Sequence, residues 1–528
     1  MSWTDDPKLA FVHPFGRHFH HQAWKIRRFL MLSGSHEPAK GLPMYIRREH
    51  DLLGDRDVPV DAYYGVHTLR AVENFPISGT PISIYPDLIA ALASIKLAAA
   101  RTNLELGLLD ATRADAIVAA AEEIRAGRLH GEFVVDVIQG GAGTSTNMNA
   151  NEVIANRALE LLGKPKGDYH TLHPNEHVNM SQSTNDVYPT ALKLAAYTGI
   201  MRLVDAMAVL RGAFEAKSEE FKDIIKMGRT QLQDAVPMTL GQEFSTYAVM
   251  LGEDEQRLKE AVLLVCEINM GATAIGTGIN AHPDYARLVC QHLKDGTGIP
   301  VVTASNLIEA TQDCGSFVQL SGVLKRVAVK LSKTCNDLRL LSSGPRVGLG
   351  EINLPPMQAG SSIMPGKVNP VIPEVVNQIA FEVIGNDITV SFAAEAGQLQ
   401  LNAFEPIIAH SLFKSVKHLT AGCLTLASKC VSGITANREH LRRGVERSIG
   451  IVTALNPYIG YANATEIAQQ ALITGVSVYD LVLEKKLLTR EQLDEILQPE
   501  VLTQPRAFRV GKADGEVHKL TLRRGQAD

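Results

Sequence analysis

A polar loop between two apolar stretches holds the residues of this chain that are best suited to chemistry. It reads Gly360-Ser361-Ser362-Ile363-Met364-Pro365-Gly366-Lys367-Val368-Asn369-Pro370. Glycines allow backbone conformations that other residues resist, and prolines stiffen the path, so this composition predicts a loop rather than a buried element. Two hydroxyls, one ammonium group and one carboxamide lie along it. This set suits the binding of a small carboxylate, and loops of this kind often carry function.

Three further polar stretches share this character. They are rich in hydroxyls and amides, and they cover residues 144–149, 181–186 and 228–234. Hydroxyls and helix N-termini bind anions without adding many fixed charges. Taken alone, however, each of these three stretches is better explained as a helix cap or a turn. The residues by themselves indicate polar loops around a helical core that suit a small dicarboxylate, and they do not specify a reaction.

Several other chemistries find no support in these stretches. They hold no Cys or His set at metal-ligand spacing and no Ser-x-x-Lys or Gly-x-Ser-x-Gly sequence. The glycine-rich run 140–143 is not followed by a lysine in the P-loop position, so it does not predict nucleotide binding. The six cysteines form no C-x-x-C pair, and we expect reduced core thiols in a cytoplasmic protein. A pairing of Cys423 with Cys430 stays open, because their spacing places them on one helical face.

Long helices must position these loops. Apolar residues recur near a 3.6-residue period in five long segments, which predicts an elongated helical bundle. These segments are 189–221, 237–270, 311–341, 370–389 and 403–435. Shorter helices are expected over 86–109, from the N-cap Asp110 to residue 128, over 151–162, and after residue 440, where Thr489 and Gln492 form a capping box.

The composition bounds the class of protein. The 528 residues are 45% hydrophobic and 21% charged, and the net charge of −5 gives no nucleic-acid footprint. No apolar run is long enough to cross a bilayer. We predict a leader over 1–43, a mainly helical N-terminal domain over 44–185, a central long-helix bundle over 186–439, a small helical domain over 440–504 and a loose tail over 505–528.

Residues 1–43 look unlike the rest of the chain. They carry a cluster of histidines but no Cys or carboxylate partners at ligand spacing, and no clean apolar region of a signal peptide. A metal site and a targeting peptide stay open as alternatives to a leader that is disordered or not translated. An orderly globular sequence follows Met44 at once, so translation that begins there is a hypothesis. Peptides from upstream of Met44 in the native protein would contradict it.

The loop at 360–369 matches the signature of the aspartase/fumarase superfamily at every defined position, and the chain is identified as a member of it. The resemblance covers roughly residues 44–500 and includes 62–68. Three segments are similar to the aspartase branch rather than to class II fumarases: the run Gly-Gly-Ala-Gly-Thr-Ser at 140–145, Thr184 where fumarases usually have a second Ser, and Gln231 where fumarases, and some aspartases, have His. The resemblance implies a mostly α, three-domain fold with a long central helical bundle that assembles into a tetramer core.

The resemblance also implies an activity, the reversible deamination of L-aspartate to fumarate and ammonia by anti elimination. Removing a proton next to the β-carboxylate gives an aci-carboxylate with a second negative charge, so the site must bind that group more strongly in the transition state. By resemblance, Ser361 would be the general base. The β-carboxylate would be surrounded by Thr144, Ser183, Thr184 and Ser362, and the α-carboxylate would be held by Thr230, Lys367 and Asn369. Asn185 would lie near the amino group or the α-carboxylate. Gln231 would bind substrate rather than act as an acid.

The same resemblance sets expectations for the loop and for partners. Backbone N–H groups after Ser361, with Lys367, would stabilise the serine alkoxide, and Gly360 and Gly366 would be hinges for loop closure. No cofactor would be required, and activation by Mg²⁺ cannot be read from the sequence. Each active site would take residues from three subunits of a homotetramer, with no nucleic-acid or membrane partner. A class II fumarate hydratase, an ammonia-lyase for a substituted aspartate and a non-enzymatic helical tetramer stay open as alternatives.

Overall fold

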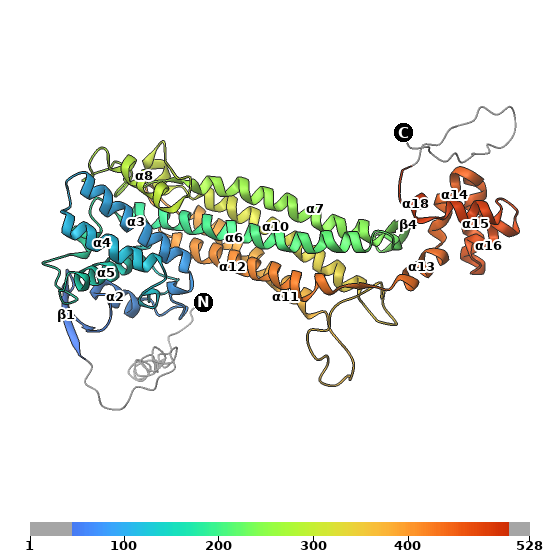
Figure 1. Ribbon diagram of the computed structural model, residues 1–528, viewed down its shortest axis with the longest axis horizontal. Helices are drawn as coiled ribbons and strands as arrows, with labels where there is room; N and C mark the ends of the chain where they lie inside the picture. Colours follow the sequence, from blue (N-terminus) through green and yellow to red (C-terminus); the bar gives the residue numbers. More distant parts are fainter. Residues whose placement is uncertain (1–44, 506–528) are drawn as a thin grey trace, which may run out of the picture. The chain divides into compact units, whose positions relative to one another are not determined.

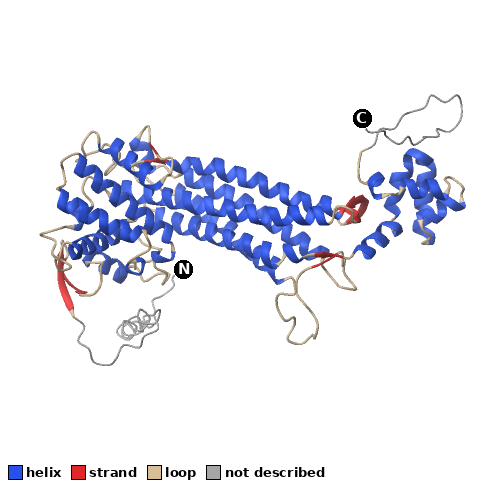
Figure 2. Ribbon diagram, viewed as in Figure 1, coloured by secondary structure: helices blue, strands red, loops and turns tan. Residues whose placement is uncertain are grey.

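The computed structural model describes residues 45–505, most of which are helical (Figure 2). The chain falls into two compact units, of which the larger comprises Arg48–Val58 and Ala62–Asp528. Of the smaller unit, the described residues are 45–47 and Pro59–Asp61, where the Val60 N–H donates to the Tyr45 carbonyl. The predicted leader at 1–43 and all but the first residue of the predicted tail lie outside the described residues.

A β-hairpin and four helices come first in the described chain. They are β1 (Ile46–Asp51), β2 (Gly54–Pro59), α2 (Val66–Asn74), α3 (Pro86–Glu105), α4 (Ala111–Arg125) and α5 (Thr144–Leu161). The Asp110 side chain accepts from the Arg113 N–H, which confirms the predicted N-cap of α4. Helix α3 packs against α4, α5 and α6, and its alanines 98–100 are almost fully buried, so that the helices approach closely. These helices form the support beneath the glycine-rich turn at 140–143.

Five long helices form the predicted central bundle. They are α6 (Thr184–Glu220), α7 (Leu240–Ala261), α10 (Gly315–Leu341), α11 (Val371–Glu395) and α12 (Glu405–Lys429). Contacts run from α6 to α7, α10, α11, α12 and back to α6, so the five helices close a ring around a shared core. Figure 1 shows these long helices running along the same direction. At 37 residues, α6 spans about 55 Å. That length decides how far apart the loops at its two ends lie.

The first turn of α6 differs from the sequence prediction, which began this helix at residue 189. Ser183 and Asp186 form a capping box that starts the helix at Thr184. Pro189 lies inside the helix and has no N–H for the Asn185 carbonyl four residues before it. The Asn269 side-chain amide donates to that carbonyl over 3.0 Å. An outside donor therefore replaces the missing helical hydrogen bond and lets the helix run through the proline.

The end of the second predicted long helix was also placed wrongly. Helix α7 stops at Ala261, and a 3-10 turn over Val262–Cys266 leads into the short strand β5 (Glu267–Ile268). The remaining strands are β3 (Ile225–Thr230), β4 (Gln233–Thr239), β6 (Val302–Thr303), β7 (Ile352–Asn353) and β8 (Thr435–Ala436), and the described strands pair as four two-stranded sheets. Two further helices are α8 (Tyr285–Thr297) and α9 (Leu307–Gln312).

Short helices with their own apolar core follow the bundle. They are α13 (Arg438–Arg447), α14 (Val452–Ile459), α15 (Tyr461–Thr474), α16 (Val478–Glu484), α17 (Arg490–Ile496) and α18 (Pro499–Leu502). Leu455, Ile467 and Leu493 lie at the centre of this second core and are fully buried. Thr489 and Gln492 form the capping box that the sequence predicts. A separate core is what a small C-terminal helical domain requires.

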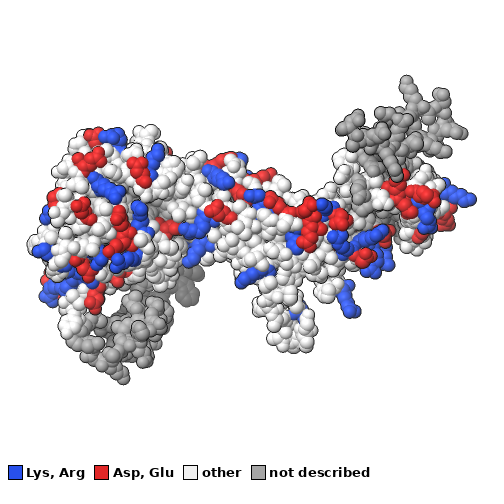
Figure 3. All heavy atoms as spheres, viewed as in Figure 1, with Lys and Arg blue, Asp and Glu red and all other residues white. Residues whose placement is uncertain are grey.

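The six cysteines are all buried free thiols, as expected. Burial raises the pKa of the Cys423 thiol to about 12, so it stays protonated near neutral pH. The alternative pairing with Cys430 is not formed. Among the described residues, no helix combines the length and the apolar character that a membrane span requires. Acidic and basic side chains are interspersed on the described part of the face in Figure 3, which agrees with the small net charge.

Candidate active site

The glycine-rich turn before α5 brings Thr144 to a helix N-terminus. Gly141 and Gly143 have positive φ angles of 86° and 89°, and Thr144 is the first residue of the helix. A Cβ on Gly143 would lie 2.3 Å from the ring of Tyr188 in α6, so only glycine fits there. The exposed Thr144 hydroxyl donates to the Gly141 carbonyl over 2.7 Å. The turn thus fixes the N-terminus of α5 against α6.

A second N-terminus, that of α6, presents Ser183, Thr184 and Asn185. The Ser183 hydroxyl accepts from the Asn185 N–H, and the Ser183 N–H donates to Asp186 over 2.9 Å. Asp186 is fully buried, and this desolvation raises the pKa of its carboxyl to about 6 despite the backbone N–H groups that it accepts. Since Asn185 donates its side-chain amide to the Ala274 carbonyl over 2.7 Å, it is held in place before any ligand binds.

The two N-termini are joined by one hydrogen bond. The Asn147 amide, on the first turn of α5, donates to the Thr184 hydroxyl oxygen over 3.2 Å. Four of the predicted substrate-binding residues, Thr144, Ser183, Thr184 and Asn185, therefore belong to one neighbourhood. Two helix N-termini with hydroxyl side chains make a site for an anion, because their unpaired N–H groups and dipoles favour negative charge.

A β-hairpin carries Thr230 and Gln231. Strands β3 and β4 pair up to Thr230 and Gln233, and Gln231 and Leu232 between them have positive φ angles of 53° and 63°. This two-residue turn fits the right-handed twist of the strands. Thr230 and Gln231 lie exposed at the tip. The hairpin interrupts the helices at the polar stretch that the sequence marks, but the sequence did not predict its strands.

The predicted base lies among backbone donors. The Ser361 hydroxyl oxygen accepts from the N–H groups of Ile363, over 3.2 Å, and Met364, over 3.1 Å. These are the donors that the sequence analysis expects after Ser361. Ser362 and Lys367 are exposed and Asn369 is half-buried, so all three can reach a ligand from solvent.

The two glycines of this loop have different roles. Gly366 has a φ of 80°, which favours glycine. A Cβ on Gly360 would lie 1.1 Å from the Lys367 carbonyl oxygen, so this glycine lets the two ends of the loop meet. Their proposed role as hinges stays a prediction.

The hairpin and the Ser361 loop share one end of the bundle. Glu351, which directly precedes β7, is ion-paired with both Lys226 and Arg229 of β3. The hairpin follows the C-terminal end of α6, whereas Thr184 begins this helix about 55 Å away. The eight residues from Asn353 to Ser361 reach at most about 28 Å when fully extended. One chain therefore holds its predicted site residues as two separate groups (Figure 1).

A cavity among the C-terminal helices holds none of the predicted site residues. Its volume is about 1050 Å³, and it is lined by residues of α13, α14 and α16, among them Arg438, Val445 and Tyr479. The geometry instead leaves both groups of predicted residues on the surface of the chain. Among the described residues, no cluster of three or more His, Cys, Asp and Glu side chains could hold a metal ion. That no cofactor is required stays a prediction.

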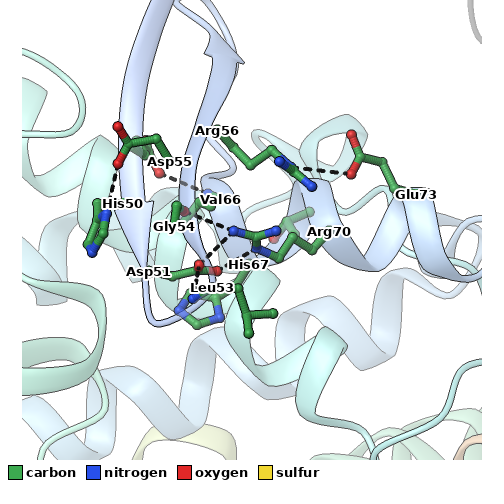
Figure 4. A network of polar contacts seen from close by, with 12 residues as sticks. His50, Asp51, Leu53, Gly54, Asp55, Arg56, Val66, His67, Arg70 and Glu73 are labelled. Atoms are coloured by element: carbon green, nitrogen blue, oxygen red, sulfur yellow. Dashed lines mark hydrogen bonds and ion pairs between the residues drawn. The ribbon is translucent and has the colours of Figure 1, made fainter.

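The stretch 62–68, part of the resemblance, serves to anchor the start of α2. The buried Glu152 carboxylate accepts the N–H groups of Gly65, His67 and Thr68, and burial raises its pKa to about 7. Nearby, Arg70 binds both carboxylate oxygens of Asp51 over 2.7 Å (Figure 4). These contacts tie the first hairpin to α2 and α5, so they indicate a structural role.

A buried lysine escaped the sequence analysis. Lys96, in the middle of α3, is fully buried and donates over 2.8 Å to the side-chain oxygens of Asn147, Asn179 and Gln182. Desolvation lowers the pKa of its ammonium group to about 7, and the negative charge of Asp186 acts in the opposite direction. The signal in the sequence was a lysine between Ile95 and Leu97, on a face that is otherwise apolar.

Known proteins are similar to this chain in sequence and in fold. The chain matches a family model described as "Lyase" over residues 54–385, and one described as "Fumarase C C-terminus" over 451–504. An aspartate ammonia-lyase of Helicobacter pylori is 58% identical over 88% of this chain and its own whole length. Those of Escherichia coli K12 and Pseudomonas aeruginosa are 56% and 59% identical, over 87% of this chain and 96% and 97% of their own lengths.

Two solved structures share the fold as well. A structure titled fumarate lyase:delta crystallin from Brucella melitensis, bound to cobalt, has a TM-score of 0.86 and is 56% identical over 87% of this chain and all of its own. A class II fumarase from Schistosoma mansoni has a TM-score of 0.82 and is 37% identical over 86% of this chain and 98% of its own. The predicted mostly α fold is confirmed. The chain belongs to the aspartate ammonia-lyases of the aspartase/fumarase superfamily and is a carbon–nitrogen lyase.

Proposed function

We propose that this protein deaminates L-aspartate reversibly to fumarate and ammonia by anti elimination. The observation that carries the proposal is Ser361, whose hydroxyl oxygen accepts two backbone N–H groups in a loop that also holds Lys367 and Asn369. A reaction that starts with loss of a carbon-bound proton needs a strong base, and this setting lowers the free energy of a serine alkoxide. The names of the relatives, at 56–59% identity, support aspartate as the substrate.

The β-carboxylate is assigned to the pocket at the N-termini of α5 and α6. Loss of the Cβ proton gives an aci-carboxylate with two negative charges on this group. Thr144, Ser183 and Thr184 supply hydroxyls beside two helix N-termini, and Ser362 joins them from the loop. Donors fixed before the reaction stabilise new charge without reorganising, so they lower the barrier to proton removal.

The α-carboxylate is assigned to Lys367, Asn369 and Thr230. Lys367 provides a point charge and Asn369 a carboxamide donor beside it, while Thr230 reaches in from the hairpin tip. Gln231 lies next to Thr230 and binds substrate, because a carboxamide does not exchange protons near neutral pH. Asn185 lies near the amino group or the α-carboxylate.

Each site is assembled from three subunits of a homotetramer. The support is the separation within one chain, where α6 alone holds Thr184 and the hairpin about 55 Å apart. Further support comes from an exposed apolar stripe on α11. Phe381, Ile388 and Phe392 lie seven and four residues apart on one helical face and are 60%, 54% and 71% exposed. A stripe of large apolar side chains on a soluble surface needs a partner.

We also propose that the enzyme needs no cofactor for this step. Ser361 accepts the proton, the hydroxyls and helix N-termini stabilise the new charge, and the ammonia leaves into solvent. A cytoplasmic location fits the six buried thiols, which oxidising compartments would not favour.

The assay that tests the function compares substrates. Purified protein is mixed with L-aspartate, with L-malate or with a substituted aspartate such as 3-methylaspartate, and fumarate or its methyl derivative is followed by absorbance. Formation of fumarate from aspartate is the expected result. Turnover of malate alone would establish the alternative, a fumarate hydratase, and preference for the substituted substrate would replace aspartate as the natural one. Absence of turnover with all three substrates would contradict the proposed function and favour the non-enzymatic alternative.

A further inference from the structure

Lys96 occupies a position where a charged group is costly. Its side chain is fully buried in α3, and moving an ammonium group out of water is unfavourable unless hydrogen bonds compensate. Three carboxamide oxygens, from Asn147, Asn179 and Gln182, lie 2.8 Å from its nitrogen. The charged side chain that acts on it from a neighbouring helix is Asp186 of α6. The lysine thus joins α3 to the first turn of α5 and to the segment that precedes α6.

The lysine determines which way these carboxamides point. Below its pKa of about 7 the Lys96 side chain is an ammonium group, which donates and never accepts, so each carboxamide turns its oxygen towards it and its NH₂ group away. The Gln182 NH₂ group then donates to the carbonyls of Val178 and Met180. The Asn147 NH₂ group donates to Asn179 and to the Thr184 hydroxyl oxygen, both over 3.2 Å. The orientation of Asn147 therefore follows from the lysine.

The hydrogen bond from Asn147 in turn fixes the direction in which the Thr184 hydroxyl proton points. Since the Thr184 oxygen accepts from Asn147, its own O–H must donate elsewhere. In the part of the chain that the structure describes, this half-buried hydroxyl has no acceptor of its own. Its proton is thus left for a ligand. The series runs from the ammonium group through the amide to the hydroxyl, and each donor in such a chain strengthens the next.

We propose that Lys96 is a positioning residue for the β-carboxylate, which acts through Asn147 to present the Thr184 proton to the substrate. This inference rests on the proposed function, because it takes Thr184 as a ligand of that carboxylate. The hydrogen bond from Thr184 gains most when the second negative charge forms. Lys96 should therefore matter more for the transition state than for binding of the ground state.

The test uses Lys96→Met, which keeps the length of the side chain and removes its donors. Kinetics with L-aspartate give kcat and KM. Two inhibitors separate ground state from transition state: succinate is a plain dicarboxylate, whereas the nitronate of 3-nitropropionate has the planar, charged geometry of the aci-carboxylate. Lys193→Met is the matched control, since Lys193 is also buried but donates to the Glu267 backbone carbonyl instead of to the site.

We expect Lys96→Met to lower kcat by about 10- to 100-fold and to weaken inhibition by 3-nitropropionate by a similar factor. KM for aspartate and inhibition by succinate should change by less than about threefold. Lys193→Met should leave the ratio of the two inhibition constants unchanged. A loss of activity no larger than that of the control, or an equal loss of both inhibitors, would overturn the proposal, because either result describes a residue that only supports the fold.

A second variant keeps the test open if Lys96→Met does not fold. Asn147→Ala breaks the series but leaves Lys96 two acceptors, Asn179 and Gln182, and the same selective loss of 3-nitropropionate binding is expected. When both variants fold, the double variant should lose no more activity than the less active of the two single variants, because the two residues act in series. Additive losses would overturn the proposal. Failure of the wild-type enzyme on aspartate would instead contradict the proposed function, so the two failures are distinguishable.

Discussion

The Ser361 hydroxyl oxygen accepts from two backbone N–H groups, and in the described residues no imidazole or carboxylate is hydrogen-bonded to it. In the proposed mechanism, Ser361 is activated by stabilising its alkoxide. The loop itself is then the source of the basicity, because the N–H groups of Ile363 and Met364 donate to the Ser361 oxygen only while the turn is formed.

Replacing Ser361 tests this role directly. Ser361→Ala should lower kcat for aspartate by about 100- to 10,000-fold, the usual contribution of a general base. The oligomeric state and the melting temperature should not change, since the side chain is partly exposed. Steady-state kinetics and size-exclusion chromatography measure both. Full activity in the variant would remove Ser361 as the base.

Lys367 should affect binding more than chemistry. In Lys367→Ala the α-carboxylate loses a charge-assisted hydrogen bond, so KM should rise by about 10- to 100-fold with a smaller change in kcat. The comparison of KM for aspartate in the wild type and the variant decides the matter. An unchanged KM would show that another cation holds this carboxylate.

The buried lysine predicts a pH dependence of stability. The pKa of Lys96 is about 7 in the folded chain, whereas that of an unfolded lysine is about 10.4. Between these two pKa values Lys96 is protonated in the unfolded chain and mostly neutral in the folded chain. The free energy of unfolding therefore rises with pH over this range. Lys96→Met should lose this rise. Melting temperatures of both proteins at pH 7 and pH 9 test it, and parallel changes in the two would contradict the assignment.

At the scale of elements, the sequence predicts what depends on periodic apolar residues. Five long helices appear where the 3.6-residue pattern places them. Their ends depend on single side chains instead: the Ser183 cap starts α6 before Pro189, and Asn269 supplies the donor that makes this possible. The β3–β4 hairpin could not be predicted, because β3 reads Ile-Lys-Met-Gly-Arg-Thr without alternation and its turn lacks the usual Asn-Gly pair.

The site was predictable only in part, for a related reason. The loop signature at 360–369 is local, so one stretch of sequence identifies it. The series from Lys96 through Asn147 to Thr184 joins residues up to 88 positions apart, and no spacing in the sequence shows it. The carboxamide orientations follow from contacts that exist only after α3, α5 and α6 have packed together.

The glycine-rich turn before α5 offers a test at this scale. Gly143→Ala places a Cβ 2.3 Å from the Tyr188 ring at a φ of 89°, so it should destabilise the fold by about 1–3 kcal/mol and displace Thr144. Gly163→Ala is the control, because Gly163 has a φ of 71° and open space around its Cβ. A lower melting temperature and lower activity are expected for Gly143→Ala. Equal effects in both variants would mean that backbone strain alone matters.

At the scale of the whole molecule, the length of α6 is the reason that we propose a site shared between subunits. The helix carries the proposed β-carboxylate pocket at its start and leads to the hairpin at its end, about 55 Å away. In this proposal, the exposed apolar stripe on α11 is the surface through which other chains supply the missing part. If the proposal holds, catalysis requires assembly, because a complete site forms only between subunits.

Complementation between two inactive variants tests that claim most directly. Ser361→Ala and Thr184→Val lie in different groups of the site, and each alone should be nearly inactive on aspartate. If the groups come from different subunits, equal coexpression of the two variants forms hybrid tetramers in which about one site in four holds both wild-type residues. We predict about a quarter of wild-type turnover for the coexpressed protein and none for purified homotetramers that are mixed without exchange. Coexpression that restores no activity would contradict a site shared between subunits.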